Sequence, residues 1–283
     1  MKYFDLHCDT ATVSFEKSLS FDSNMLSVNS KVGKSFTDYK QCFAIFINEN
    51  KKCPFEFYKN CIYNFKNKLK NKQVNLTPIF TVEGGIVIED DISRVYTLYN
   101  DGIKTVSLTW NGETTLAGGV NTESPLKPFG IDFLKELNSL NIACDLSHLN
   151  TKSFYGAIEY ADNVIATHSN CFSVCPHKRN LTDEQLLLIK EKQGIVGLCV
   201  YPLFLGGNDV FEDFYKHLYH ILDLGLENNV SIGSDFDGAD MDKKLSSPDD
   251  MECLYKFLNN KGIEISILNR LFYENADNFF LKL

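Results

Sequence analysis

Short runs of apolar and β-branched residues recur along the chain, separated by stretches with polar or helical patterning. Runs of this kind are typical of strands in a parallel sheet that helices cover. The candidate strands are Tyr3–Leu6, Cys42–Ile47, Leu76–Val82, Ile103–Leu108, Ile142–Leu146, Asn163–Thr167, Gly194–Val200 and Val230–Gly233. The pattern therefore predicts eight buried strands.

Helix signals fill most of the intervals between these strands. Thr182-Asp183-Glu184-Gln185 is a capping box in front of an apolar segment. Ser247 and Pro248 form an N-cap and N1 pair before another amphipathic stretch. Eight strand and helix units in one domain of about 250 residues are typical of a closed barrel. We therefore predict the α/β class and a (β/α)8 TIM barrel rather than an open sheet.

The first unit departs from this regular alternation. Residues 10–41 are rich in Ser, Asn, Asp and Lys, which predicts an irregular segment rather than a helix. Long loops above a barrel often shape an active site. We expect this segment to cover the mouth of the barrel.

Length and composition narrow the class of protein. No linker rich in Pro, Ser or Gly and no fixed repeat divides the chain, so residues 1–283 are predicted to form one domain. No apolar run approaches the roughly 18 to 20 residues that cross a bilayer. Asp5 and His7 interrupt the apolar start of the chain, which argues against a signal peptide. We expect a cytoplasmic protein without a membrane span.

Charge and cysteine usage add two further expectations. The formal net charge is -9 and no basic stripe is clustered, which disfavours nucleic-acid binding. The nine cysteines form no C-x-x-C pair and are expected to be reduced. Cys171, Cys175 and His177 could ligate zinc, but three closely spaced ligands make an incomplete structural site, so a plain loop is favoured.

Reactive side chains gather at the predicted strand ends. The carboxyl ends of barrel strands converge on one mouth, and imidazoles with carboxylates are ligands that zinc prefers. Acids beside neutral imidazoles in one cavity carry large desolvation and repulsion costs unless a cation is present. The pattern therefore predicts a metal centre with enough ligands for two ions. The residues are His7 and Asp9 (first strand), Glu83 (third), His148 (fifth), His168 (sixth) and Asp235 (eighth).

Six motifs carry a family resemblance. No single motif is specific for a family, but six motifs in the same order and at plausible spacing are specific. They are Phe4-Asp5-Leu6-His7-Cys8-Asp9-Thr10, Val82-Glu83-Gly84-Gly85, Asp145-Leu146-Ser147-His148, Thr167-His168-Ser169-Asn170, Lys178-Arg179-Asn180-Leu181 and Gly233-Ser234-Asp235-Phe236-Asp237-Gly238. The chain resembles the membrane (renal) dipeptidase family of zinc peptidases, peptidase family M19, nearly from end to end.

The resemblance implies a (β/α)8 barrel with two Zn²⁺ per chain that hydrolyses dipeptides, often ones with a D-residue at the carboxyl end. It implies that His7 and Asp9 hold one zinc, that His148 and His168 hold the other, and that Glu83 bridges the two. It also suggests a homodimer.

The same resemblance assigns roles around the metals. Asp235 matches the catalytic acid/base, Arg179 matches the clamp on the substrate carboxylate, and Asn180 is expected beside it in the substrate site. One position departs from the family's pattern. Its better-known mammalian members carry a substrate-contacting histidine after strand 4, and Trp110 stands in that place here. Trp has one N–H donor and an apolar face, so we expect it to shape the substrate pocket.

The mechanism expected from these residues needs no protein nucleophile. As a hypothesis, two zinc ions share a hydroxide that attacks the scissile carbonyl, while Asp235 carries the proton to the departing amine. Asp237 is the rival for that role, since a two-residue spacing places both acids on one strand face. Cys8 is expected to point away from His7 and Asp9.

Several alternatives stay open at this point. Amidohydrolases of the broader metal-dependent kind usually open with H-x-H and bridge their metals with a carbamylated lysine, so His7-Cys8-Asp9 favours the dipeptidase. Another amide or lactone hydrolase on the same metal centre remains possible. Trp110 also keeps open a weakly catalytic barrel that binds metal or ligand. His217 and His220 share one helix face, which is expected to pack outside the barrel.

Overall fold

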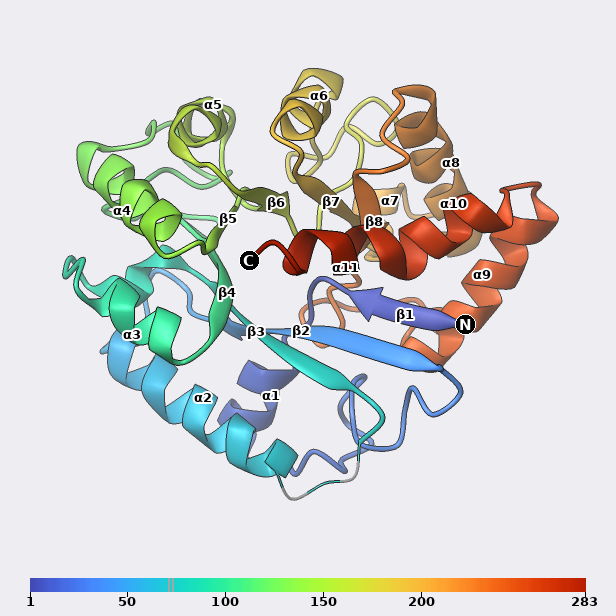
Figure 1. Cartoon of the computed structure of the whole chain (residues 1–283), viewed down its shortest axis with the longest axis horizontal. Coiled ribbons are helices and arrows are strands. Elements are labelled where there is room, and N and C mark those ends of the chain that lie inside the picture. Colours follow the sequence, from blue (N-terminus) through green and yellow to red (C-terminus); the bar gives the residue numbers. More distant parts are fainter. Residues whose placement is uncertain (71, 73) are drawn as a thin grey trace.

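The computed structural model describes residues 1–70, 72 and 74–283. Within them the strands are parallel and close into a barrel in chain order, with β8 returning to β1. The strands are β1 (Lys2–Asp5), β2 (Asp38–Phe46), β3 (Thr77–Glu83), β4 (Ile103–Ser107), β5 (Ala143–Asp145), β6 (Val164–Ala166), β7 (Ile195–Leu198) and β8 (Val230–Ile232). Figure 1 shows helices around the outside of this ring. The predicted (β/α)8 barrel is confirmed.

The strand boundaries follow the apolar runs, with the largest difference at β2. This strand begins at Asp38, four residues before the predicted start at Cys42. The parallel register pairs Lys2 with Asp38 and Asp5 with Gln41. Backbone hydrogen bonds to β1 thus extend β2 through residues that hydropathy alone would leave in a loop.

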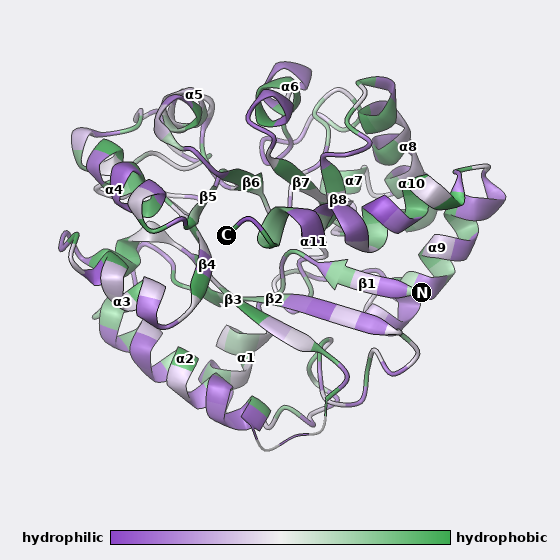
Figure 2. Ribbon diagram, in the orientation of Figure 1, coloured by the Kyte–Doolittle hydropathy of each residue, from purple (hydrophilic) through white to green (hydrophobic). Residues whose placement is uncertain are grey.

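The helices lie between the strands in sequence and outside them in space. The predicted helix start at Thr182 is confirmed, because Thr182 with Gln185 forms a capping box at α6. Ser247 and Pro248 instead open a 3-10 turn, Pro248–Asp250, which leads directly into α9. Figure 2 shows apolar and polar residues alternating around the helices, as expected when one face is buried. No helix in the described ranges has the length and apolarity to cross a bilayer. The helices are α1 (Thr10–Glu16), α2 (Pro54–Lys70), α3 (Arg94–Asn100), α4 (Pro128–Ser139), α5 (Thr151–Tyr160), α6 (Asp183–Glu191), α7 (Pro202–Leu205), α8 (Val210–Asp223), α9 (Met251–Asn260), α10 (Ile265–Asn269) and α11 (Asn275–Phe280).

The prediction of an irregular chain throughout residues 10–41 is wrong at both ends, since α1 and the start of β2 lie within it. The buried residues of α1 are small or carry hydroxyl groups, which reads as a polar segment in sequence. The Thr12 hydroxyl accepts a hydrogen bond from Phe46 N at 2.7 Å, so this polar group is satisfied against β2. Between the two elements Phe21 is buried edge-on against Phe43 and Phe65, which anchors the irregular part.

The last part of the chain closes the amino-terminal end of the barrel. A single π-helical turn, η3 (Arg270–Glu274), and α11 pack against β1 and β8. In Figure 1 the C-terminus lies within the ring of strands. This floor is an apolar core, so the polar side chains that could do chemistry lie at the opposite end of the barrel. Its buried residues are Phe4, Leu6, Cys42, Ala143, Ile165, Ile195, Tyr273, Ala276 and Phe279.

Candidate metal centre

The predicted metal ligands come together at the carboxyl ends of the strands, but most of them lie beyond the strands themselves. Glu83 is the last residue of β3, whereas β1 already ends at Asp5 and Asp9 is the N-cap of α1. The expectation that His7 and Asp9 sit on the strand is therefore wrong. His148 has a φ of 71° and Asp235 a φ of 66°, conformations that L-residues seldom adopt. Turns that follow the strands, rather than extended backbone, therefore set the direction of the His148 and Asp235 side chains.

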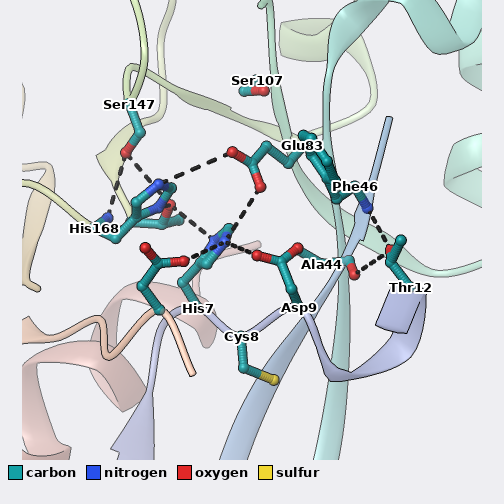
Figure 3. Close-up of polar contacts among 12 residues, drawn as sticks. His7, Cys8, Asp9, Thr12, Ala44, Phe46, Glu83, Ser107, Ser147 and His168 are labelled. Carbon is teal, nitrogen blue, oxygen red and sulfur yellow. Dashed lines mark hydrogen bonds and ion pairs between the residues drawn. The ribbon is translucent and has the colours of Figure 1, made fainter. Parts of the chain in front are cut away.

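Glu83 lies at the centre of the cluster. Its Oε1 is 2.7 Å from His148 Nε2 and 4.0 Å from His168 Nε2, and its Oε2 is 3.3 Å from His7 Nε2. Figure 3 shows His7, Glu83 and His168 directed toward one another, whereas Cys8 is directed away. The predicted direction of Cys8 is confirmed, because its Sγ donates to Cys42 O at 3.3 Å. The two oxygens of one carboxylate thus face different imidazoles.

Three carboxylates surround the Nε2 atom of His7. This nitrogen lies 3.3 Å from Glu83, 3.7 Å from Asp9 and 3.9 Å from Asp235. In the described residues it still makes no hydrogen bond of good geometry, and Asp9 Oδ1 is likewise buried without a partner. Buried polar atoms normally have partners, and leaving them without one is costly. A cation among these atoms would remove that cost.

The other two imidazoles are oriented through their Nδ1 atoms. His148 Nδ1 lies 2.9 Å from Asn111 Oδ1, and His168 Nδ1 lies 2.9 Å from Thr167 Oγ1. An amide oxygen can only accept, so His148 Nδ1 donates and its Nε2 carries the lone pair. The two Nε2 atoms approach within 2.8 Å. No role was predicted for Asn111 or Thr167 from the sequence, although Asn111 follows Trp110 and Thr167 precedes His168.

Burial shapes the ionisation of these groups. Burial lowers the pKa of His148 to about 4. Burial also raises the pKa of Asp235 to about 8 and that of Asp9 to about 6. For Glu83 burial acts in the same upward direction, but the charge and hydrogen bond of His148 hold its pKa well below the ordinary value. Burial also lowers the pKa of His168, whereas at His7 the hydrogen bonds and charges of Asp9 and Glu83 outweigh burial and raise the pKa well above its ordinary value. A metal ion would supply the positive charge that these buried acids otherwise draw from His7.

The donor atoms fall into overlapping groups. In each group the ligand atoms lie within 4.8 Å of one another, counted over the residues that the structure describes. Two of these groups share Glu83, as two ions with a bridging carboxylate require. The residues therefore fit the metal pair that the resemblance implies, while each assignment as a ligand stays a prediction. The groups are His7 with Asp9 and Glu83, Glu83 with His148 and His168, and His7 with His168 and Asp235.

Arg179 lies beside the donor groups with only 5% of its surface exposed. Its Nη2 donates to His168 O at 3.2 Å, while its Nε has no partner in the described chain. No carboxylate of the described residues pairs with this guanidinium within 4.0 Å. A buried cation without a counter-ion is costly, so the site is suited to an anionic group from outside the chain.

Asn180 has backbone partners on both sides of its amide. Its Nδ2 donates to Cys175 O at 2.9 Å and to Phe204 O at 2.8 Å, and its Oδ1 accepts from Asn170 N at 3.2 Å. These contacts hold the loop that carries Arg179. Direct contact between Asn180 and a substrate stays a prediction.

A cavity of about 230 Å³ lies over the donor groups, and part of its wall is apolar. Trp110 belongs to this wall, with its ring 5.2 Å from that of Phe46 and 6.2 Å from that of His148. Helix α1 contributes as well, so part of the 10–41 segment borders the mouth as expected. Besides the donor residues, the cavity is lined by Thr12, Val13, Glu16, Phe46, Trp110, Phe204, Asp237 and Gly238.

Asp237 has different surroundings from Asp235. Its carboxylate accepts hydrogen bonds from Thr10 Oγ1 at 2.5 Å and from Ser27 N at 2.7 Å. It therefore ties the 10–41 segment to the turn after β8. Asp235 instead lies among the donor groups, 3.9 Å from His7 Nε2. Both aspartates line the cavity over the donor groups, and the choice of Asp235 as the acid/base stays a prediction.

The remaining histidines and cysteines that sequence analysis considered have structural contacts. His217 is buried on α8, where its Nδ1 accepts from Cys171 N and its Nε2 donates to Leu205 O, both at 3.1 Å. His220 Nε2 lies 2.7 Å from Asp183 Oδ1. Figure 1 places α8 outside the barrel, as expected. The other contacts are Cys171 Sγ to His217 O, Cys175 Sγ to Leu203 O and Arg179 N to His177 Nδ1.

Two glycines leave room for the site. Gly84 follows Glu83 with a φ of 115°, and a Cβ there would collide with Ile47 O. A Cβ at Gly238 would collide with the carboxylates of Asp9 and Asp235. A larger residue at Gly238 would therefore displace Asp9 or Asp235, and one at Gly84 would press on the backbone of Ile47 next to Glu83.

A closed α/β barrel with imidazoles and carboxylates grouped at its mouth fits the class of metal-dependent enzymes. The sequence model of the membrane dipeptidase family, peptidase family M19, matches residues 57–279. The chain belongs to this family and is a metallo-dipeptidase, an enzyme that hydrolyses a peptide bond. The resemblance carried by the six motifs is confirmed. The motif with His7 and Asp9 lies ahead of the matched span.

Two individual relatives are similar to much of this chain. An uncharacterized protein of Klebsiella pneumoniae is 29% identical over 215 residues, which cover 71% of this chain and 79% of the relative. An uncharacterized dipeptidase of Schizosaccharomyces pombe is 26% identical over 240 residues, covering 81% of this chain and 55% of that protein.

Solved structures show the same fold. A metallo peptidase from Rhodobacter sphaeroides, liganded with a phosphinate mimic of the dipeptide L-Ala-D-Ala, superposes with a TM-score of 0.92 at 21% identity over 100% of this chain and 99% of that one. A dipeptidase of family M19 gives a TM-score of 0.86 at 23% identity, covering 100% and 98%.

Proposed function

We propose that this metallo-dipeptidase uses two zinc ions and acts on dipeptides with a free C-terminal carboxylate, including those with a D-residue at that end. The observation that carries the proposal is the position of Glu83. Its Oε1 faces His148 and its Oε2 faces His7, on opposite sides of one buried carboxylate. A single ion would need only one of these sides, whereas a bridged pair uses both.

The donor chemistry supports zinc. His7 and Asp9 with Glu83 would hold one ion, and His148 and His168 with Glu83 the other. Imidazole nitrogens with carboxylate oxygens are the ligand types that zinc takes in catalytic sites. When bound, such ions supply Lewis acidity for the scissile carbonyl and a nucleophilic water at neutral pH.

Asp235 is proposed as the acid/base. Its carboxylate lies at the donor cluster and is 8% exposed, so water has limited access to it. From this place it takes a proton from the attacking water and delivers it to the departing amine. Cys8 cannot act as a competing nucleophile, because its side chain is buried away from the mouth.

Arg179 is proposed to bind the substrate carboxylate. Its buried guanidinium has free hydrogen-bonding capacity and no ion partner in the described residues. The planar fork of arginine matches a carboxylate through two parallel hydrogen bonds. The Rhodobacter sphaeroides relative with its L-Ala-D-Ala mimic supports a test of D-residues at the C-terminal position.

The test is a substrate panel on zinc-loaded protein: L,L and L,D dipeptides, their C-terminal amides, N-acyl amino acids and lactones. Hydrolysis of free dipeptides well above that of their amides is the expected result. Faster turnover of N-acyl amino acids or lactones would assign the centre to another amide or lactone hydrolase. No turnover of any member at full zinc content would favour a binding barrel. The homodimer and the cytoplasmic location stay predictions.

A further inference from the structure

Two buried aspartates form matching clamps on opposite sides of the barrel. Asp5 ends β1 and Asp145 ends β5, and each is at most 3% exposed. Each accepts the backbone N–H two residues further on, from His7 at 3.3 Å and from Ser147 at 3.0 Å. Both aspartates therefore fix the turn that leads to a predicted metal ligand.

Each clamp also holds a hydroxyl residue on a neighbouring strand. Asp5 accepts Ser234 N at 2.8 Å and Ser234 Oγ at 2.6 Å. Asp145 accepts Thr167 N at 3.1 Å and Thr167 Oγ1 at 2.6 Å. Ser234 directly precedes Asp235, and Thr167 directly precedes His168. The two clamps share their geometry and burial, which makes one a natural control for the other.

The clamps differ in what the hydroxyl oxygen faces on its other side. Thr167 Oγ1 lies 2.9 Å from His168 Nδ1 and 3.4 Å from His7 Nδ1. Ser234 Oγ instead lies 3.1 Å from His7 O and 3.2 Å from Phe236 N. Within the described chain, no imidazole nitrogen is among its hydrogen-bond partners. Only the Asp145 clamp of this pair can act on a histidine ring.

A proton count sets the direction of the Thr167 bonds. A threonine hydroxyl has one proton and two lone pairs, and a carboxylate oxygen accepts only. Thr167 Oγ1 donates that proton to Asp145 Oδ2 in a hydrogen bond of 2.6 Å. The oxygen is then left as an acceptor for the Nδ1 proton of His168 at 2.9 Å. Its second lone pair has two more distant neighbours, His7 Nδ1 and Ser147 Oγ, each at 3.4 Å.

We propose that Thr167, held by Asp145, is a positioning residue that fixes His168 as the Nδ1–H tautomer and directs its Nε2 to the metal. This inference rests on the proposed role of His168 as a zinc ligand. A hydrogen bond behind a ligating histidine fixes the ring and raises its basicity, and losing it typically lowers metal affinity 10- to 100-fold.

The experiment compares Thr167→Val, which removes the hydroxyl at nearly constant shape, with Thr167→Ser, which keeps it. Zinc affinity of the full chain is measured by competition with a chelator. We expect Thr167→Val to lose about 10- to 100-fold in affinity at one site and Thr167→Ser to retain wild-type affinity. Nitrogen-15 NMR of the zinc-loaded wild type should show His168 bound through Nε2, with a proton on Nδ1. Equal affinity of Thr167→Val and wild type, or an unprotonated Nδ1, would overturn the inference.

Ser234→Ala is the matched control, because it removes an equally buried hydroxyl from the sister clamp. We expect it to keep wild-type zinc affinity and the NMR pattern of His168. A loss as large as that of Thr167→Val would show general loosening of the mouth and overturn the tautomer role. A wild-type chain that binds zinc, but not through His168, would defeat the proposed ligand set as well, which separates that failure from a failure of Thr167 alone.

Discussion

The two ends of the barrel differ in the side chains that they bury: the floor buries apolar residues, and the mouth buries imidazoles and carboxylates. At the floor, Phe4 packs its ring 6.2 Å from Tyr273 and 5.3 Å from Phe280, and the surrounding cluster is apolar. At the mouth, His7 Nε2, Asp9 Oδ1 and Arg179 Nε are buried without hydrogen-bond partners in the described chain. A floor of this kind stabilises the fold, while buried and unpaired polar groups destabilise it.

Left-handed backbone does not distinguish the two ends. His148, Asp235 and Asp237 at the mouth have φ values of 71°, 66° and 66°, and Asn141 and Gln193, just before β5 and β7 at the floor end, both have a φ of 54°. The contrast therefore lies in the side chains: the mouth buries polar groups at a cost in stability, whereas the floor buries apolar groups that stabilise the fold. Changes at the mouth should therefore alter chemistry, and changes at the floor should alter folding.

The largest effect is expected for Asp235→Asn at the mouth. The substitution keeps the shape of the side chain and removes its ability to carry a proton. We expect turnover of a dipeptide substrate to fall about 100- to 10,000-fold, or roughly 3 to 5 kcal/mol in the barrier. Zinc content by plasma emission and the melting temperature should stay near wild type. Full activity in this variant would remove Asp235 from the mechanism.

Phe4→Ala at the floor should act in the opposite way. Its side chain is fully buried, so the cavity is expected to lower the free energy of unfolding by about 3 to 4 kcal/mol. Urea denaturation measures this loss, and Phe4→Leu serves as a milder control. Below the unfolding transition, kcat/KM should stay at the wild-type level. A parallel fall in kcat/KM would show that the floor and the mouth are coupled.

The buried histidine of α8, His217, should make the free energy of unfolding depend on pH in acid. Burial lowers its pKa to about 4, from an ordinary value of 6.5. Between pH 4 and pH 6.5, His217 is therefore protonated in the unfolded chain and neutral in the folded chain. The resulting stability is fully present above pH 6.5 and is lost as the pH falls toward 4, by up to about 3 kcal/mol.

The check for His217 is the pH dependence of unfolding in wild type and in His217→Gln, which cannot titrate. The wild type should lose more stability than the variant between pH 6.5 and 4. Parallel curves for the two proteins would contradict the depressed pKa.

Arg179→Lys tests whether Arg179 binds the substrate carboxylate, because lysine keeps the positive charge. Lysine lacks the planar fork, so we expect KM for a free dipeptide to rise about 10- to 100-fold while kcat changes less. A dipeptide with an amidated C-terminus should be affected far less. Equal effects on both substrates would mean that Arg179 does not bind the carboxylate.

The smallest effect is expected for Trp110→Phe. The structure gives Trp110 ring contacts with Phe46 and His148, and phenylalanine preserves an apolar wall there. If packing is its role, kcat/KM should change by less than the roughly 10-fold that one lost hydrogen bond produces. A larger loss would show that the indole N–H contacts the substrate.

Most of the fold could be predicted because the strands are buried on both sides. Continuous apolar runs such as Val230–Ile232 have no polar face to obscure them. The helix α1 was missed because Thr10, Thr12 and Ser14 bury hydroxyl groups that only the folded structure satisfies. Hydropathy cannot distinguish such a face from a loop.

The candidate site divides in the same way. His7, Asp9, Glu83, His148 and His168 were predicted, because strand order alone brings their segments to one mouth. The hydrogen bonds of Thr167 and Asn111 were not predicted, since they depend on ring orientation in turns after the strands. Partners fixed by local turn geometry leave no periodic pattern in the sequence.

Zinc stoichiometry tests the central claim most directly. Plasma emission on the purified, zinc-equilibrated chain should find two ions per chain, one for each donor group that shares Glu83. Glu83→Gln, which keeps the shape and removes the bridging charge, should hold fewer ions under the same conditions. One ion or none in the wild type, or two ions at unchanged affinity in Glu83→Gln, would contradict a centre built around this carboxylate.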